Sequence, residues 1–133
     1  MKSGLAIYNI LSRDSDVISM VARRIFPNVA KNGTEFPFII YDVESESPTD
    51  TKDGVSTLDE DFVMVSCYCK TYSEASDLAR KIRTALDRKI GTFGGIEIQS
   101  IQYNGYNDLF DDNTSDEGVY RKALDFKLRI INN

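Results

Sequence analysis

The clearest hydrophobic pattern lies in residues 61–91, where an alternating segment leads directly into a segment with helical spacing. From Phe62 to Lys70 successive side chains point to opposite faces, as they do in a β-strand. One face carries Val63, Val65, Cys67 and Cys69, and the other carries Phe62, Met64, Ser66 and Tyr68. Because both faces are largely apolar, we expect cover on both sides, by helices or by another subunit.

A helix is predicted immediately after this strand. Thr71 and Glu74 have the spacing of a capping box, with Ser73 as a competing N-cap, and Gly91 is placed to end the helix. The apolar stripe that this helix must bury consists of Ala75, Leu78, Ala79, Ile82, Ala85 and Leu86.

The first 46 residues predict two helical segments and two extended segments. Residues 3–22 have helical spacing, and residues 12–16 are rich in N-capping side chains, so the second helix should begin there. The segment Arg24–Pro27 reads as extended because the residue before a proline avoids the helical region. Pro37–Glu46 alternates as a strand does.

Two further strands are predicted in the last third of the chain. Ile96 and Ile98 begin the first, and a change of phase near residues 99–100 indicates a β-bulge or bend before the strand ends at Asn104–Gly105. Val119–Ile131 is the second, with an apolar face and a charged face. We expect these two strands to pair in antiparallel fashion.

Two acidic, turn-rich segments, Ser45–Leu58 and Asn107–Gly118, lack apolar periodicity and are predicted to be long loops. Loops of this kind are candidates for contact with partners. The candidate contact residues are Pro48, Asp50, Lys52 and Asp53 in the first loop and Asp108, Phe110, Asp111 and Asp112 in the second.

Together these elements predict an α+β fold with a mixed, mainly antiparallel sheet of about four to five strands. One long crossover helix and two short N-terminal helices complete it. The 133 residues suit a single domain, 1–133, large enough to bury its own core.

Composition limits the classes of function that this chain can have. The formal net charge of −5 argues against sequence-specific DNA binding. No run approaches the roughly 20 apolar residues of a membrane span, so we expect a protein made in the cytosol with no membrane partner. Cys67 and Cys69 lie on one strand face, where they are poorly disposed to join each other, and read as reduced core residues.

The sequence argues against an enzyme and predicts no cofactor or metal. It has no histidine, no Gly-rich phosphate loop, no dinucleotide fingerprint and no nucleophile elbow. Asp111, Asn113 and Ser115 alternate as calcium ligands do, but Asp116 stands where an EF-hand loop needs glycine. We predict a protein that associates with copies of itself rather than an enzyme. The candidate subunit-interface residues are Phe62, Met64, Tyr68, Arg121, Lys127 and Arg129.

Read end to end, the order of motifs resembles the tail-completion or tail-terminator family of long-tailed bacteriophages and prophages. None of the motifs is catalytic, and the resemblance rests on their order and spacing. They are Ile7-Tyr8-x-x-Leu11-Ser12-x-Asp14, Arg24-Ile25-Phe26-Pro27, Phe36-Pro37-Phe38-Ile39, the segment with Pro48 and Asp53-Gly54, Val65-x-x-Tyr68, Thr71-Tyr72-x-Glu74-Ala75, Leu78-Ala79-x-x-Ile82-Arg83-x-Ala85-Leu86, and Tyr120-Arg121-x-x-x-Asp125-Phe126.

The resemblance implies a structural virion or prophage protein. Such a protein forms a ring, expected to be hexameric, at the head-proximal end of the tail tube, where it ends tube polymerisation and joins the tail to the head connector. Its expected partners are other copies of itself, the tail tube protein and the connector or stopper protein, with DNA only passing through the ring. The expected location is the host cytoplasm during assembly and then the virion tail.

Two alternatives stay open at this stage. One is a head-side connector or stopper protein, which shares the size and the ring-forming habit. The other is a bacterial adaptor domain that binds another protein.

Overall fold

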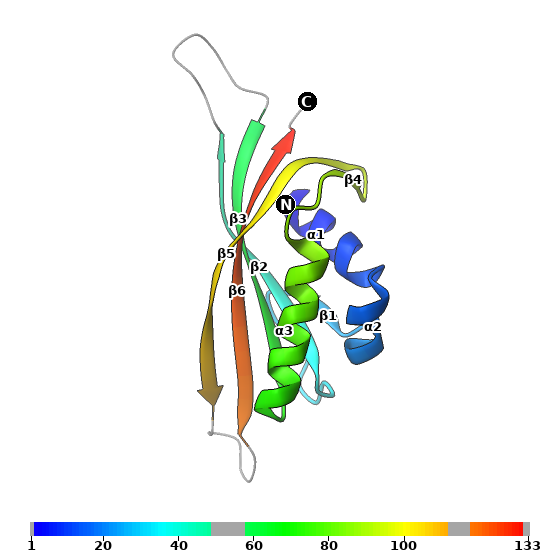
Figure 1. The fold of residues 1–133 in the computed structure, drawn as a ribbon, viewed down its shortest axis with the longest axis vertical. Helices are drawn as coiled ribbons and strands as arrows, with labels where there is room; N and C mark the ends of the chain where they lie inside the picture. The colour runs from blue at the N-terminus through cyan, green and yellow to red at the C-terminus, as the bar shows by residue number, and fades with distance from the viewer. Residues whose placement is uncertain (1, 49–57, 112–117, 132–133) are drawn as a thin grey trace.

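The computed structural model describes residues 2–48, 58–111 and 118–131. Three helices and six strands lie within these residues (Figure 1). In chain order they are α1 (Lys2–Ser12), α2 (Ser15–Val21), β1 (Ile25–Pro27), β2 (Phe38–Pro48), β3 (Leu58–Cys69), α3 (Tyr72–Leu86), β4 (Gly91–Phe93), β5 (Ile96–Asp111) and β6 (Val119–Ile131).

The strands form one sheet in the order β1-β2-β3-β6-β5-β4. Only β1 and β2 pair in parallel, and the other four pairings are antiparallel. The predicted α+β class with a mainly antiparallel sheet is therefore confirmed, as is the antiparallel pairing of β5 with β6. The described sheet has six strands rather than four to five, because the short segments β1 and β4 add to its two edges.

All three helices lie on the same side of the sheet, and the core fills the space between them (Figure 1). The odd-numbered face of β3 points into this core, as do the apolar residues of β6 and the stripe of α3. Cys67 and Cys69 are both buried and free, in agreement with their prediction as reduced core residues. The two faces of β6 also follow the predicted division into apolar and charged.

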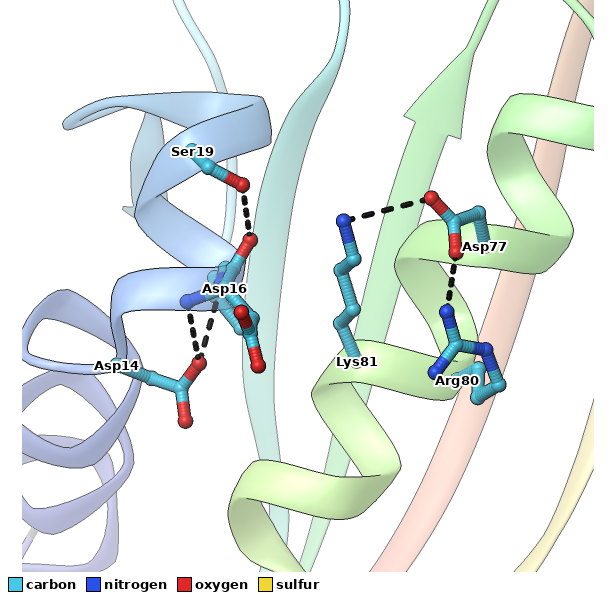
Figure 2. A network of polar contacts seen from close by, with 7 residues as sticks. Asp14, Asp16, Ser19, Asp77, Arg80 and Lys81 are labelled. Carbon is cyan, nitrogen blue, oxygen red and sulfur yellow. Dashed lines mark hydrogen bonds and ion pairs between the residues drawn. The ribbon is translucent and has the colours of Figure 1, made fainter.

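Local capping signals position α2 and α3. The Asp14 carboxylate accepts hydrogen bonds from the backbone N–H groups of Asp16 and Val17, both at 3.0 Å, and so starts α2 within the predicted segment (Figure 2). Thr71 Oγ1 accepts from the Glu74 N–H at 3.1 Å at the start of α3. The prediction that Gly91 ends this helix is wrong, because α3 ends at Leu86 and Gly91 begins β4.

The strand β5 differs most from expectation. Its register shifts between Ile98 and Ser100, which confirms the predicted bulge. The predicted end at Asn104–Gly105 is wrong: a second shift there is accommodated by Gly105, with φ of 118°, and β5 continues to Asp111. A single Gly-containing irregularity changes the phase of the side chains without ending the pairing with β6.

Both segments predicted to be loops therefore begin with strand residues. Residues 107–111 belong to β5, and residues 45–48 belong to β2, which ends at Pro48. Residues 49–57 and 112–117, which include Asp50, Lys52, Asp53 and Asp112, lie outside the described part of the chain.

Candidate interaction surfaces

The face of the sheet opposite the helices is the first candidate surface, and we call it the open face. On β3 it carries Phe62, Met64, Ser66 and Tyr68, the even-numbered positions of the alternating segment. Phe62 is 37% exposed, and Met64 and Tyr68 are half-buried. We expected helices or another subunit to cover each face of this strand; the three described helices pack on the other face, so they do not cover Phe62, Met64 and Tyr68 (Figure 1).

One end of the open face is an aromatic cluster. The ring of Phe38 on β2 stacks on Tyr68, with centroids 4.8 Å apart and planes 12° apart. Phe26 and Phe36 pack against Phe38 from the sides. This mutual cover buries Phe38 without a helix above it, and burial raises the pKa of the Tyr68 hydroxyl. Tyr68 therefore contributes to the fold of the subunit itself.

The predicted basic residues of the open face all lie on β6 and all have partners within the subunit. Arg121 lies over the Tyr68 ring and donates a hydrogen bond from Nη2 to Ser66 Oγ at 3.2 Å. The Glu60 carboxylate on β3 forms salt bridges with Lys127, at 3.8 Å, and with Arg129, at 3.1 Å. Partly exposed pairs of this kind contribute little to stability and can exchange partners at an interface.

The far end of the β5–β6 hairpin carries a second candidate surface. Here Tyr72, Tyr106, Leu109 and Phe110 are all exposed, and Phe110 packs on Tyr120 with ring centroids 4.8 Å apart. The sequence marks Phe110 as a candidate contact residue and Tyr106 as a candidate interface aromatic, but it gives no such role to Tyr72, which lies on α3 and meets the other two only in the folded chain. Tyr106, Asp108 and Phe110 alternate on one strand face, because β5 resumes after Gly105.

Asp108, another predicted contact residue, forms a salt bridge with the buried amine of Lys122 across the β5–β6 pair. The Lys122 Nζ also lies 4.5 Å from the Tyr72 ring centroid and 4.9 Å from that of Tyr106. Burial disfavours the charged amine, but the Asp108 carboxylate and the Tyr72 hydroxyl outweigh it and raise the pKa of Lys122. Lys122 and Asp108 therefore hold the rings of Tyr72 and Tyr106 in place within the second candidate surface.

The described residues show other features that bear on function. No group of three or more His, Cys, Asp or Glu side chains in residues 2–48, 58–111 and 118–131 is arranged to hold a metal ion. No helix in the same part of the chain is long and apolar enough to cross a membrane.

Comparison with known proteins assigns the chain to a family. The family model described as tail completion protein gp17 matches residues 5–131. The chain belongs to the tail completion protein gp17 family. This family consists of structural proteins of phage tails, and the resemblance read from the motifs is thereby confirmed.

The tail completion fold also occurs among solved structures. A chain in the virion of a native gene transfer agent (GTA) particle superposes with a TM-score of 0.79 at 14% sequence identity. The match covers 98% of this chain and 93% of that chain, so the two share a fold over nearly their whole length. No curated protein matches this tail completion sequence.

Proposed function

We propose that this tail completion protein caps the head-proximal end of the phage tail tube, ends its polymerisation and joins the tail to the head connector. In this proposal it acts as a ring of identical subunits, expected to be hexameric. The observation that carries the proposal is the open face of the sheet, which has no helical layer over it in the described chain and which carries Phe62 and Met64 on β3.

A sheet face that exposes apolar side chains such as Phe62 and Met64 among charged ones, with no covering layer in the described chain, is suited to contact with another protein. Burying apolar surface contributes about 25 cal/mol for each Å² removed from water. Monomeric proteins rarely leave large apolar patches in water, so such patches commonly mark interfaces. We assign Phe62 and Met64 to the subunit interface, with Tyr68, Arg121, Lys127 and Arg129 around them.

The two ends of the sheet support contact with two different partners. The end of β2 and the start of β3 lie at one extreme of the molecule, and the end of β5 and the start of β6 lie at the opposite extreme (Figure 1). A subunit that joins two assemblies needs a contact surface at each end. We assign the tube and connector contacts to these ends, with Pro48 on β2 at the first and Asp108, Phe110 and Asp111 on β5 at the second. The other predicted contact residues, Asp50, Lys52, Asp53 and Asp112, lie outside the described part of the chain.

The net charge of −5 suits a ring through which DNA passes without being held, because like charges repel the phosphate backbone. A ring with a strongly basic lumen would contradict this part of the proposal.

The proposal is tested with purified full-length protein and tail tubes grown from the tube protein of the same phage. We expect electron micrographs to show rings at one end of each tube and a shorter mean tube length as protein is added. Phe62→Asp should abolish capping while the subunit stays folded, because the new carboxylate faces Lys127 across the β3–β6 pair. Ser19→Asp, at an exposed position on α2, is the matched control.

Tubes of unchanged length with no rings at their ends would contradict tail termination. Binding to the isolated head connector without binding to tubes would instead support a head-side stopper. Capping by Phe62→Asp at the wild-type level would show that the open face is not the surface involved.

A further inference from the structure

Charge is strongly segregated between two segments of the chain. Residues 42–61 contain eight carboxylates and one lysine, whereas residues 80–90 contain five cationic side chains and one carboxylate. The described part of the first segment lies on β2 and β3, and the second covers the end of α3 and the connection to β4. The strand order puts β2 and β5 near opposite edges of the sheet.

The end of α3 is held against the β5 edge by two hydrogen bonds. The Arg88 N–H donates to the Ile101 carbonyl at 2.9 Å, and the Tyr103 N–H donates to Asp87 Oδ1 at 3.1 Å. The Arg83 guanidinium lies 4.1 Å from the centroid of the Tyr103 ring. These contacts place Arg83 and Arg88 at the β5 edge, on a rigid support, and we call this pair the basic edge.

The acidic counterpart sits at the other end of the same row of the sheet. Cross-strand pairing runs from Tyr103 on β5 through Phe126 and Val63 to Val43 on β2. Asp42 and Glu44 flank Val43 in the sequence, and we call this pair the acidic edge. β1 pairs with β2 only up to Tyr41, so in the described chain no strand lies outside this part of β2.

Neither edge is neutralised within the subunit. Earlier on α3, the cations Arg80 and Lys81 are already paired with Asp77, at 2.5 Å and 3.4 Å (Figure 2). Arg83 and Arg88 differ from them in this respect. No ion pair joins Arg83, Arg88, Asp42 or Glu44 to any other residue that the structure describes.

The acidic edge is also electrostatically crowded. Burial raises the pKa of Glu44, and the nearby carboxylates of Asp125 and Asp42 raise it further. A cation brought against this edge would relieve repulsion that the isolated subunit has to bear.

We propose that the acidic edge of one copy lies against the basic edge of the next copy, with Asp42 and Glu44 facing Arg83 and Arg88. This inference rests on the proposed function, because a ring of identical subunits requires two different, complementary surfaces on each copy. Asp42 lies on the open face, opposite Met64 in the β2–β3 pair, whereas Arg83 lies on the helix side of the sheet over Tyr103. The contact therefore brings the β2 edge of the open face of one copy against the helix side of the next copy. A head-to-tail contact of this kind closes into a ring when the rotation between neighbours divides a full turn, and otherwise gives an open filament.

The experiment uses two charge-reversal variants of the full chain. Asp42→Lys with Glu44→Lys makes both edges positive, and Arg83→Glu with Arg88→Glu makes both edges negative. We expect each variant alone to need about 100-fold or more protein for ring formation on tail tubes, because like charges across an interface are strongly unfavourable. An equimolar mixture should restore rings in which the two variants alternate.

The matched control for the second variant is Arg13→Glu with Lys31→Glu, which makes the same change of net charge at exposed positions that belong to neither edge. Rings are counted by electron microscopy, and native mass spectrometry measures their composition. Alternation requires an even number of subunits and equal numbers of the two variants.

Two results would overturn the inference while leaving the proposed function intact: wild-type ring formation by either reversed variant, or loss of ring formation in both without rescue by mixing. Failure of the wild-type protein to form rings on tubes would overturn the proposed function and the inference with it. Rescue by mixing supports the inference, since two misfolded variants would not restore each other.

Discussion

The salt bridge between Lys122 and Asp108 joins a buried group to an exposed one, and this difference predicts unequal effects of removing either partner. The Lys122 side chain is 6% exposed, whereas the Asp108 side chain is 43% exposed. Without Asp108, Lys122 would keep only a 3.4 Å contact with the Tyr72 hydroxyl and the two tyrosine rings. Without Lys122, the exposed Asp108 carboxylate would be hydrated by solvent.

We expect Asp108→Ala to destabilise the protein by about 2 kcal/mol. Removing one partner from a fully buried pair costs ~3–5 kcal/mol, and the exposure of Asp108 lowers that figure. Lys122→Met should cost about 1 kcal/mol or less, because methionine fills similar space without a buried charge. The exposed neighbour Asn107→Ala, on the opposite face of β5, serves as the control and should change stability by less than ~0.5 kcal/mol.

Urea unfolding followed by far-UV circular dichroism measures these free energies. The raised pKa of Lys122 sets the pH dependence: the stabilisation is present below the ordinary lysine pKa of about 10.4 and is lost as the pH rises above it. The difference between wild type and Asp108→Ala should therefore stay constant from about pH 7 to about pH 9. A larger loss for Lys122→Met than for Asp108→Ala would refute the reasoning.

Three further predictions concern the subunit fold. Thr71→Ala removes the N-cap of α3 and should lower the free energy of unfolding by about 1 kcal/mol in urea titrations, whereas Thr71→Ser should restore it. Leu78→Ala leaves a cavity in the core and should cost ~2–5 kcal/mol by the same assay; a loss below that range would show that the site collapses. Burial raises the pKa of Asp61, so the contribution of this group to wild-type stability should fall as the pH rises above about 4, the ordinary pKa of an aspartate. The Tm of Asp61→Asn relative to that of the wild type should therefore increase over the same pH range. A Tm difference that does not change with pH would contradict this prediction.

Local patterns were enough to predict much of this fold. The strand and helix of residues 61–91 were specified by alternation, by the Thr71 cap and by the apolar stripe, all of which act over a few residues. The bulge after Ile98 and the two faces of β6 were predicted for the same reason. The family resemblance also came from motif order, which requires no knowledge of pairing.

Tertiary structure decided the rest, because strand length and cover depend on partners far along the chain. Residues 107–111 look like a loop in isolation, and they form a strand because β6 supplies pairing as far as Val119. The sequence left open which side of β3 the helices would cover, since both of its faces are apolar. Only the sheet order places Asp42 and Glu44 at one end of a row and Arg83 at the other, because that row joins four strands from distant parts of the chain.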